Sequence, residues 1–480
     1  MSPNEKSGSP SDKHEPARER AALRDHPVGF WFFFWGEFAE RCCYYGMRAI
    51  LLLYMIRVLG FSDGEASRVM SYFIAACYLL PLIGGYVADN YLGKYRTIVG
   101  FCVPYIAGQL MLAIEAFQNR TFLFISLALL AMGSGVIKPN ISTLMGLTYD
   151  QKRPGRTKLR SDAFAMFYGA INIGAALSSF AMPWIRDRYG YATAFLFPAA
   201  LMTMAFLIFA SGKPFYGVET IQRKRLSPEE RRQRLVVLRR IFGLFVVVTF
   251  FWSIFDQSAT TWTLFAKDHL ALDVFNHPPG AWQHALLTFA RDRLGVDLFE
   301  TSLPPDLLQT INPVLIVLLL PPITLLWHYL ARIGFDLKPT SKMLIGFVLT
   351  TITMAIMSAA GFLAAESGKV SVLWEVVSYL LITVAEICIS VVGLELAFTA
   401  APATMKSFVT ACWLLTVFFA NMINAQVTPL YGQTVLGVEL SPGRYFGLFA
   451  LIMIPVTGAF VIMARRFNRP SGSPEQGPGS

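Results

Sequence analysis

The chain has 480 residues, of which 54% are hydrophobic and only 15% are charged. A soluble protein of this length would usually divide into about three domains, but apolar runs of about 20 residues recur along the whole chain, which excludes an ordinary soluble fold. The net charge of +10 raises the possibility of a nucleic-acid partner. The basic residues cluster at the ends of apolar runs, however, and therefore indicate lipid headgroups instead.

These runs predict an all-α membrane protein, because helices satisfy their backbone hydrogen bonds within each span. We expect twelve transmembrane helices, at residues 28–56, 67–88, 97–117, 121–148, 162–184, 189–211, 239–266, 307–331, 343–365, 374–401, 407–433 and 444–464. The polar segments 1–27 and 467–480 are predicted to be disordered tails. The first of them has no apolar core and does not resemble a secretory signal.

The basic residues predict the orientation of the chain. With the N-terminus in the cytoplasm, 28 of the 41 Lys and Arg residues lie on the cytoplasmic side and 10 on the other. This distribution follows the positive-inside rule. Both basic clusters, 151–160 and 221–240, then lie inside. We therefore expect a multi-pass membrane protein with both termini in the cytoplasm.

The spans divide into two groups of six. The polar segment 212–238 separates them and predicts a cytoplasmic linker between bundles at 28–211 and 239–466. This division rests on the count of spans, since sequence similarity between the halves is too weak to see. Within the outer loop 267–306, residues 280–300 have a helical pattern but too many charges to span, and we expect a surface helix there.

The sequence gives little support for a metal site or for enzymatic activity. All six cysteines lie in apolar runs and are interpreted as packing residues, not as disulfides or metal ligands. The histidines lie in tails, in loops or near a span end, and none forms a pair with metal-ligand spacing. Neither a Gly-x-Ser-x-Gly motif nor a phosphate-binding loop occurs. We expect no metal, no cofactor and no enzymatic activity.

Ionisable residues inside the spans are the main functional signal, because a charge at this depth costs at least ~2.5–3.5 kcal/mol. Glu37, Glu40 and Arg41 are spaced to share one helix face, and Tyr44, Tyr45 and Arg48 extend it. The other polar residues singled out within the spans are Tyr78, Lys138, Asn172, Asp256, Gln257, Asn312, Glu386, Ser390 and, near a span end, Glu395.

Two interpretations of these residues remain open. The groups either pair within the bundle and fix its packing, which suits an isolated Asn or Ser, or they line a transport pathway. Acids and bases on at least four helices favour the second. Carboxylates can carry protons when burial favours their neutral form. A channel, or a membrane receptor or scaffold without transport, is the alternative from another class.

Several motifs resemble one transporter family. Residues 84–97, GGYVADNYLGKYRT, resemble the loop between the second and third helices of the major facilitator superfamily, with Asp89 placed to cap or pair with basic residues at helix ends. The stretch Glu37-x-x-Glu40-Arg41-x-x-Tyr44-Tyr45 matches the E-x-x-E-R-x-x-Y-Y motif of the proton-dependent oligopeptide transporter family. FYGAINIG (167–174), GSGVIKPN (133–140), FWSIFDQ (251–257), INPV (311–314), and Glu386 with Ser390 and Trp413 also fit that family.

The resemblance implies the major facilitator fold and import of di- and tripeptides driven by protons. The proton-coupling residues would be Glu37, Glu40, Arg41, Asp256 and Glu386. The peptide-binding residues would be Tyr44, Tyr45, Arg48, Tyr78, Lys138, Asn172, Asn312, Ser390 and Trp413. The gating residues would be Arg48, Asp256, Lys138, Glu386 and Asp89.

Two features depart from many bacterial members of the family. The linker is too short for the two extra helices that they carry, and Cys42-Cys43 replaces an aromatic residue. Neither change touches a charged position of the motif. We expect a monomer in a bacterial inner membrane. The alternative is a member of the same family that carries another solute, such as a modified peptide, a drug or an anion.

Overall fold

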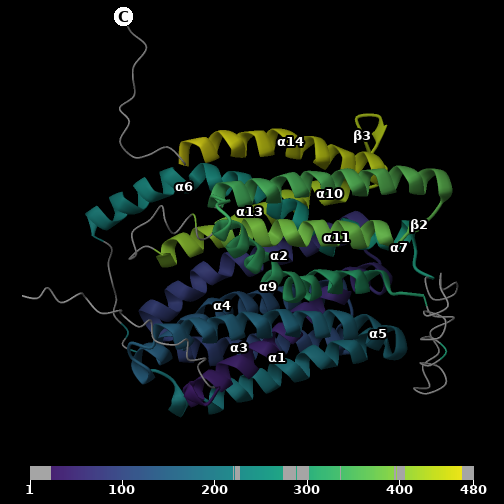
Figure 1. Cartoon of the computed structure of the whole chain (residues 1–480). Coiled ribbons are helices and arrows are strands. Elements are labelled where there is room, and N and C mark those ends of the chain that lie inside the picture. Colours follow the sequence, from purple (N-terminus) through teal and green to yellow (C-terminus); the bar gives the residue numbers. More distant parts are fainter. Residues whose placement is uncertain are drawn as a thin grey trace, which may run out of the picture.

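The computed structural model describes residues 23–219, 221, 227–273, 288, 302–335, 337–393, 396 and 406–467. Most of both predicted tails, the predicted surface helix at 280–300 apart from residue 288, and Glu395 lie outside the described residues. Helices make up nearly all of the described chain (Figure 1).

The long helices follow the apolar runs in order. They are α1 (Val28–Arg57), α2 (Asp63–Val87), α3 (Lys94–Ala113), α4 (Arg120–Lys152), α5 (Thr157–Ser211), α6 (Pro228–Phe255), α7 (Thr261–His269), α9 (Ile311–Arg332), α10 (Pro339–Ser367), α11 (Leu373–Glu386), α13 (Lys406–Val427) and α14 (Pro442–Phe467). Four two-residue strands also form, β1 (Leu270–Ala271), β2 (Val370–Ser371), β3 (Thr434–Val435) and β4 (Val438–Glu439).

Twelve membrane-length segments result among the described residues. Ten helical stretches are long and apolar enough to cross a membrane. One of them, α5, is two spans that meet at Gly190, whose φ of 83° breaks the helix. The 30-residue helix α1 is not among the ten, because its charges lower its apolar character. Dividing α5 and adding α1 gives the twelve spans predicted from the sequence.

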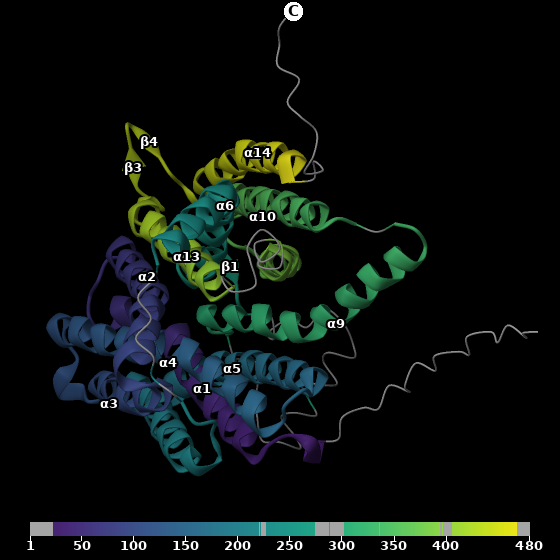
Figure 2. The same ribbon diagram turned by 90° about the vertical axis from the view of Figure 1, so that its left-hand side faces the viewer.

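The helices pack into two groups with separate hydrophobic cores. One core is built almost entirely from residues 30–216, and the other from residues 237–460. Figure 2, viewed along the helices, shows the purple-to-blue group and the teal-to-yellow group side by side. The two-bundle architecture is therefore confirmed. The bounds of each bundle stay predictions, and α6 begins at Pro228, inside the predicted linker.

The seventh span is not the continuous helix that its apolar pattern predicts. It consists of α6, a 3₁₀ turn at Asp256–Ala259, and α7. No Pro or Gly marks this break in the sequence. At the far end of α7, β1 pairs in parallel with β2, which joins this span to the start of α11 at the end of the molecule remote from the termini.

Close approach of α10 and α14 depends on glycine. A Cβ atom on Gly361 would lie 2.4 Å from the backbone nitrogen of Gly443, so the two helices touch backbone to backbone. A Cβ on Gly458, also on α14, would meet no atom within 4 Å.

We expect Gly361→Ala to destabilise the fold by ~1–3 kcal/mol, because the added methyl group must push the two backbones apart. The unfolding temperature in detergent measures this effect. Gly458→Ala is the matched control and should leave that temperature unchanged or slightly higher. Equal temperatures for the two variants would contradict the close-packing argument.

Candidate functional site

The charged stripe of α1 forms a closed ion-pair cluster. The Nε atom of Arg41 lies 3.0 Å from Oε1 of Glu37, and its Nη2 atom also pairs with Glu40. All three side chains are buried, with exposures of 2% or less. When both acids are ionised, the three side chains together have a net charge of minus one. One bound proton therefore makes the cluster neutral.

The glycine at the end of the FYGAINIG motif allows α5 to approach this stripe. A Cβ on Gly174 would lie 3.0 Å from the carbonyl oxygen of Phe38 and 3.5 Å from Cβ of Arg41. The thiol of Cys42 donates to the carbonyl oxygen of Gly174 at 3.4 Å. The motif thus brings α5 directly onto the α1 face that carries the ion pairs.

Lys138 of α4 completes the charged region. Its Nζ atom lies 5.0 Å from the ring centroid of Tyr78, a cation–π contact. Lys138 also lies within electrostatic range of Glu37, Glu40 and Arg41. A change of charge in the stripe therefore changes the electrostatic potential at Lys138.

A cavity of about 130 Å³ lies between the two halves. The N-terminal half contributes Tyr45, Arg48, Tyr78, Asn172, Ala175 and Ser179. The C-terminal half contributes Trp252, Phe255, Asp256, Ser258, Gln309, Asn312, Pro313, Tyr379 and Glu386. The cavity thus holds both signs of charge, several amide and hydroxyl groups, and aromatic walls.

Arg48 and Asp256, two of the predicted gating residues, form an ion pair at this cavity. Nη2 of Arg48 donates to Oδ1 of Asp256 at 3.2 Å, across the two halves. The amide of Asn421 donates to the other carboxylate oxygen of Asp256 at 2.6 Å. The break between α6 and α7 places Asp256 at this point.

Glu386, another predicted gating residue, is hydrogen-bonded to an amide. Its Oε2 atom accepts a hydrogen bond from Asn312 at 2.8 Å, and Asn312 also donates to Thr383. Lys138 lies on Tyr78 instead, and among the described residues no ion pair joins it to Glu386. Lys138 and Glu386 are therefore not paired in this structure, and their gating role stays a prediction.

The remaining predicted residues lie away from the cavity wall. Tyr44 is buried in the N-terminal core, and Trp413 packs edge-on against Phe245 in the C-terminal core. Ser390 lies in the π-helical turn that follows α11. These three residues do not line the cavity in this structure. Trp252, Gln309 and Tyr379 do line the cavity. They were not singled out from the sequence, because nothing there distinguishes them from the other aromatic and amide residues of the spans.

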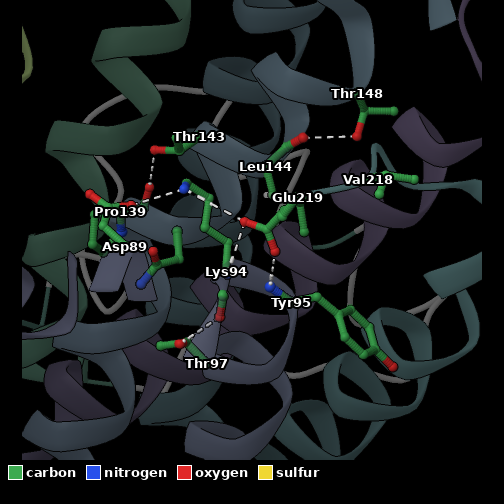
Figure 3. Close-up of polar contacts among 12 residues, drawn as sticks. Asp89, Lys94, Tyr95, Thr97, Pro139, Thr143, Leu144, Thr148, Val218 and Glu219 are labelled. Atoms are coloured by element: carbon green, nitrogen blue, oxygen red, sulfur yellow. Dashed lines mark hydrogen bonds and ion pairs between the residues drawn. The ribbon is translucent and has the colours of Figure 1, made fainter. Parts of the chain in front are cut away.

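Asp89 lies in a separate contact near the terminus-bearing end. Nζ of Lys94 lies 2.9 Å from Asp89 and 3.6 Å from Glu219. The Glu219 carboxylate also accepts hydrogen bonds from the backbone N–H groups of Lys94 and Tyr95, at 2.9 and 3.0 Å (Figure 3). Glu219 therefore caps the start of α3, a favourable place for an acid. This role of Glu219 has no signature in the sequence.

Further contacts join the halves toward the end remote from the termini. Arg186 at the end of the fifth span pairs with Asp306, and both side chains are almost completely buried. Lys267 pairs with Asp63 at 2.9 Å, and the amide of Gln426 donates to the hydroxyl of Tyr72 at 2.8 Å. Together with Arg48 and Asp256, these contacts hold that end of the molecule closed.

A second cavity of about 120 Å³ lies among α6, α13 and α14. Its walls are almost entirely apolar, with Phe250, Ile423 and Leu448 among the lining residues and no charged side chain. It lies within the C-terminal half alone. It offers nothing that would recognise a charged solute.

We expect Asp306→Asn to lower the unfolding temperature, because it leaves Arg186 buried with a neutral partner. Losing one member of a buried pair costs ~3–5 kcal/mol, and the lower end applies here since Arg186 keeps Asp187 at 2.8 Å. Asp187→Asn is the control, because Asp187 is 46% exposed. Equal effects of the two substitutions would contradict a special role for the buried pair.

Comparisons with known proteins agree with this architecture. The POT family model matches residues 95–231 and 281–439. Dipeptide and tripeptide permease A of Proteus mirabilis is 27% identical over 486 residues, covering 95% of this chain and 96% of its own. Solute carrier family 15 member 1 of Homo sapiens is 29% identical over 391 residues, covering 69% of this chain and 51% of its own. The chain thus spans about half the length of this human relative.

Solved structures show the same fold. The crystal structure of an auto-inhibited POT family peptide transporter superposes with a TM-score of 0.78 at 25% identity, covering 93% of this chain and 99% of that one. A peptide transporter POT mutant in complex with alafosfalin gives 0.77 at 25% identity, covering 93% and 96%. The fold is that of the major facilitator transporters, and the family model covers more than half of the sequence. This chain belongs to the POT family.

Proposed function

We propose that the protein is a proton-coupled symporter that imports di- and tripeptides by alternating access. The observation that carries this proposal is the cavity between the halves, whose wall presents Arg48 together with Asp256 and Glu386. A short peptide is a zwitterion, so it needs both signs of charge. The names of the permease and solute carrier relatives support the same substrate class.

The two ends of a peptide have matching groups. Arg48, with Lys138 behind Tyr78, would hold the carboxylate end. Asn172, Asn312 and Glu386 would hold the ammonium group and the backbone. Aromatic walls such as Tyr45 and Trp252 would accept varied side chains, because aromatic faces select weakly among them.

Proton coupling is assigned to the buried acids. The α1 cluster can change its charge by one proton without moving a helix, and Lys138 lies within electrostatic range of the result. Release of a proton there would leave a negative charge that attracts Lys138 away from a peptide carboxylate. The proton and the peptide would thus leave the cavity in the same half of the cycle.

The orientation follows from the basic residues. The positive-inside rule assigns the terminus-bearing end to the cytoplasm. The closed end of this structure then faces outward, and the structure corresponds to an inward-facing state of a monomer in a bacterial inner membrane. In the opposite state, Lys138 and Glu386 would approach each other, and their attraction would compensate for the ion pairs that break at the outer end.

Uptake of a labelled dipeptide into proteoliposomes under an imposed proton gradient tests this function. Accumulation that unlabelled di- and tripeptides compete away would support it. Accumulation of an amino acid, a drug or an anion, with no effect of peptides, would favour a family member with another substrate. Binding without any uptake would favour a receptor.

We expect Glu40→Gln to abolish proton-driven uptake, because the α1 cluster would lose one of the two carboxylates that pair with Arg41 and would be neutral without a bound proton. The assay is accumulation of labelled dipeptide with and without a gradient. Glu115→Gln, at an exposed acid in the loop after α3, should accumulate as much peptide as the unmodified protein. Full gradient-driven accumulation by Glu40→Gln would show that this carboxylate carries no coupling proton.

We expect Asp256→Asn to separate exchange from uphill transport. A proton on Asp256 cancels its attraction to Arg48, so the outer end opens more readily at low external pH. Each pH unit supplies ~1.4 kcal/mol per proton, and 100 mV adds ~2.3 kcal/mol per charge moved. These energies are comparable to the few kcal/mol between alternating states.

Counterflow and gradient-driven uptake on the same proteoliposomes measure the two activities of Asp256→Asn. Counterflow should survive, whereas accumulation should be lost. Undiminished accumulation would assign the gating proton to Glu37, Glu40 or Glu386 instead.

A further inference from the structure

One buried acid takes no part in the site described above. Glu375 lies in the first turn of α11 and is 0% exposed. Neither of its carboxyl oxygens has a hydrogen-bond partner among the described residues, and no ion pair includes it. Every other buried acid of the spans named above has a basic or amide partner.

An ionised carboxylate without a partner is far more costly in an apolar interior than its neutral form, so such a group binds a proton. A neutral Glu375 removes this cost. The closed arrangement of the outer end therefore favours a proton on Glu375.

Two phenols lie close enough to Glu375 to interact with it electrostatically. Tyr379, one turn further along α11, and Tyr431, which follows α13, both lie within electrostatic range of it. Trp262 of α7 packs edge-on against Tyr379, with ring centroids 5.1 Å apart. On the neighbouring helix α10, the acid at this end is Glu366, which is exposed.

Tyr431 connects Glu375 to the junction of the halves. It packs against the hydrophobic cores of both halves. It also lies within electrostatic range of Asp63 and Asp268, which both pair with Lys267. Separation of the halves at this end would remove the N-terminal side of that packing and open a path to Glu375.

We propose that Glu375 senses the pH of the outer medium: it must bind a proton before the outer end can close. The proton comes from the outer medium onto a carboxyl oxygen while the halves are apart, and it returns to the same side when they part again. Glu375 therefore adds no transported proton. This inference rests on the proposed transport cycle, but its test needs neither a peptide nor a gradient.

The paired acids of the outer end work in the opposite direction. Protonation of Asp256, Asp63 or Asp306 weakens an ion pair between the halves and favours opening. The pH dependence of closure is thus a sum of opposing contributions. The contribution of Glu375 is the difference between the unmodified protein and a variant that cannot ionise at this position.

The distance between the halves at the outer end measures closure. Spin labels at Glu115→Cys and Leu436→Cys, both exposed, report that distance in the full-length protein in lipid nanodiscs. The six native cysteines are buried, and the unsubstituted chain checks that they stay unlabelled. Distances are recorded by pulsed electron resonance from about pH 5.5 to about pH 8.5, without peptide.

Glu375→Gln has nearly the same shape and stays neutral at every pH. We expect the open-to-closed ratio of the unmodified protein to rise with pH more steeply than that of Glu375→Gln. The factor by which the two ratios differ should grow by up to about tenfold per pH unit. At high pH, Glu375→Gln should be the more closed. Glu366→Gln, which changes the exposed acid, is the control and should have the same pH profile as the unmodified protein.

Identical pH profiles with and without the acid would overturn the proposal. Glu375→Leu is a second variant that cannot ionise, and it should behave like Glu375→Gln. Failure of both variants to fold would also overturn it, because a neutral group of similar size should fit where a protonated carboxyl fits. Failure of dipeptide uptake would disprove the proposed function and leave this distance measurement unaffected.

Discussion

The arrangement of this protein depends on the cost of a charge that has no partner inside a dry helical bundle. Arg48 is on the first helix and cannot face lipid, and its carboxylate partner Asp256 is in the other half of the chain. Arg186 and Asp306 repeat this arrangement with almost no exposure to solvent. Each pair satisfies two buried charges only while the halves are together, so pairing and closure are a single event.

Ion pairs within one half serve a different purpose from ion pairs between halves. The cluster of Arg41 with Glu37 and Glu40 lies on a single helix and persists whichever way the halves tilt. Under the proposed function, this cluster changes its number of bound protons without any movement of the halves. The pairs between halves can change only when the conformation changes. Under the proposed function, coupling of protons to movement needs both kinds of ion pair. Lys138 lies within electrostatic range of the α1 cluster and also contacts the cavity residue Tyr78.

The sequence predicts the fold well, because the hydrophobic runs and charged loops report directly on the membrane. It predicts the cavity in part: Arg48, Asp256, Asn312 and Glu386 line it, whereas Ser390 and Trp413 do not. Residues near predicted span ends were missed. Arg186 and Asp306 lie just outside the predicted spans, so they resemble ordinary loop charges, and Glu375 lies just inside one. Pairing over 120 residues of chain, and a helix break without Pro or Gly, leave no local pattern to find.

The contact around Glu219 explains why the two ends of the molecule can alternate. Glu219, Lys94 and Asp89 all belong to the N-terminal half or to the segment that directly follows it, so their bonds stay intact when the halves move. Toward the remote end, by contrast, the pairs of Arg48 with Asp256 and of Lys267 with Asp63 cross between the halves. A tilt of the halves would therefore break the pairs between halves and leave the Glu219 contact intact. New contacts in the opposite state must then compensate for the lost pairs, so that the difference in free energy stays small enough for protons to reverse.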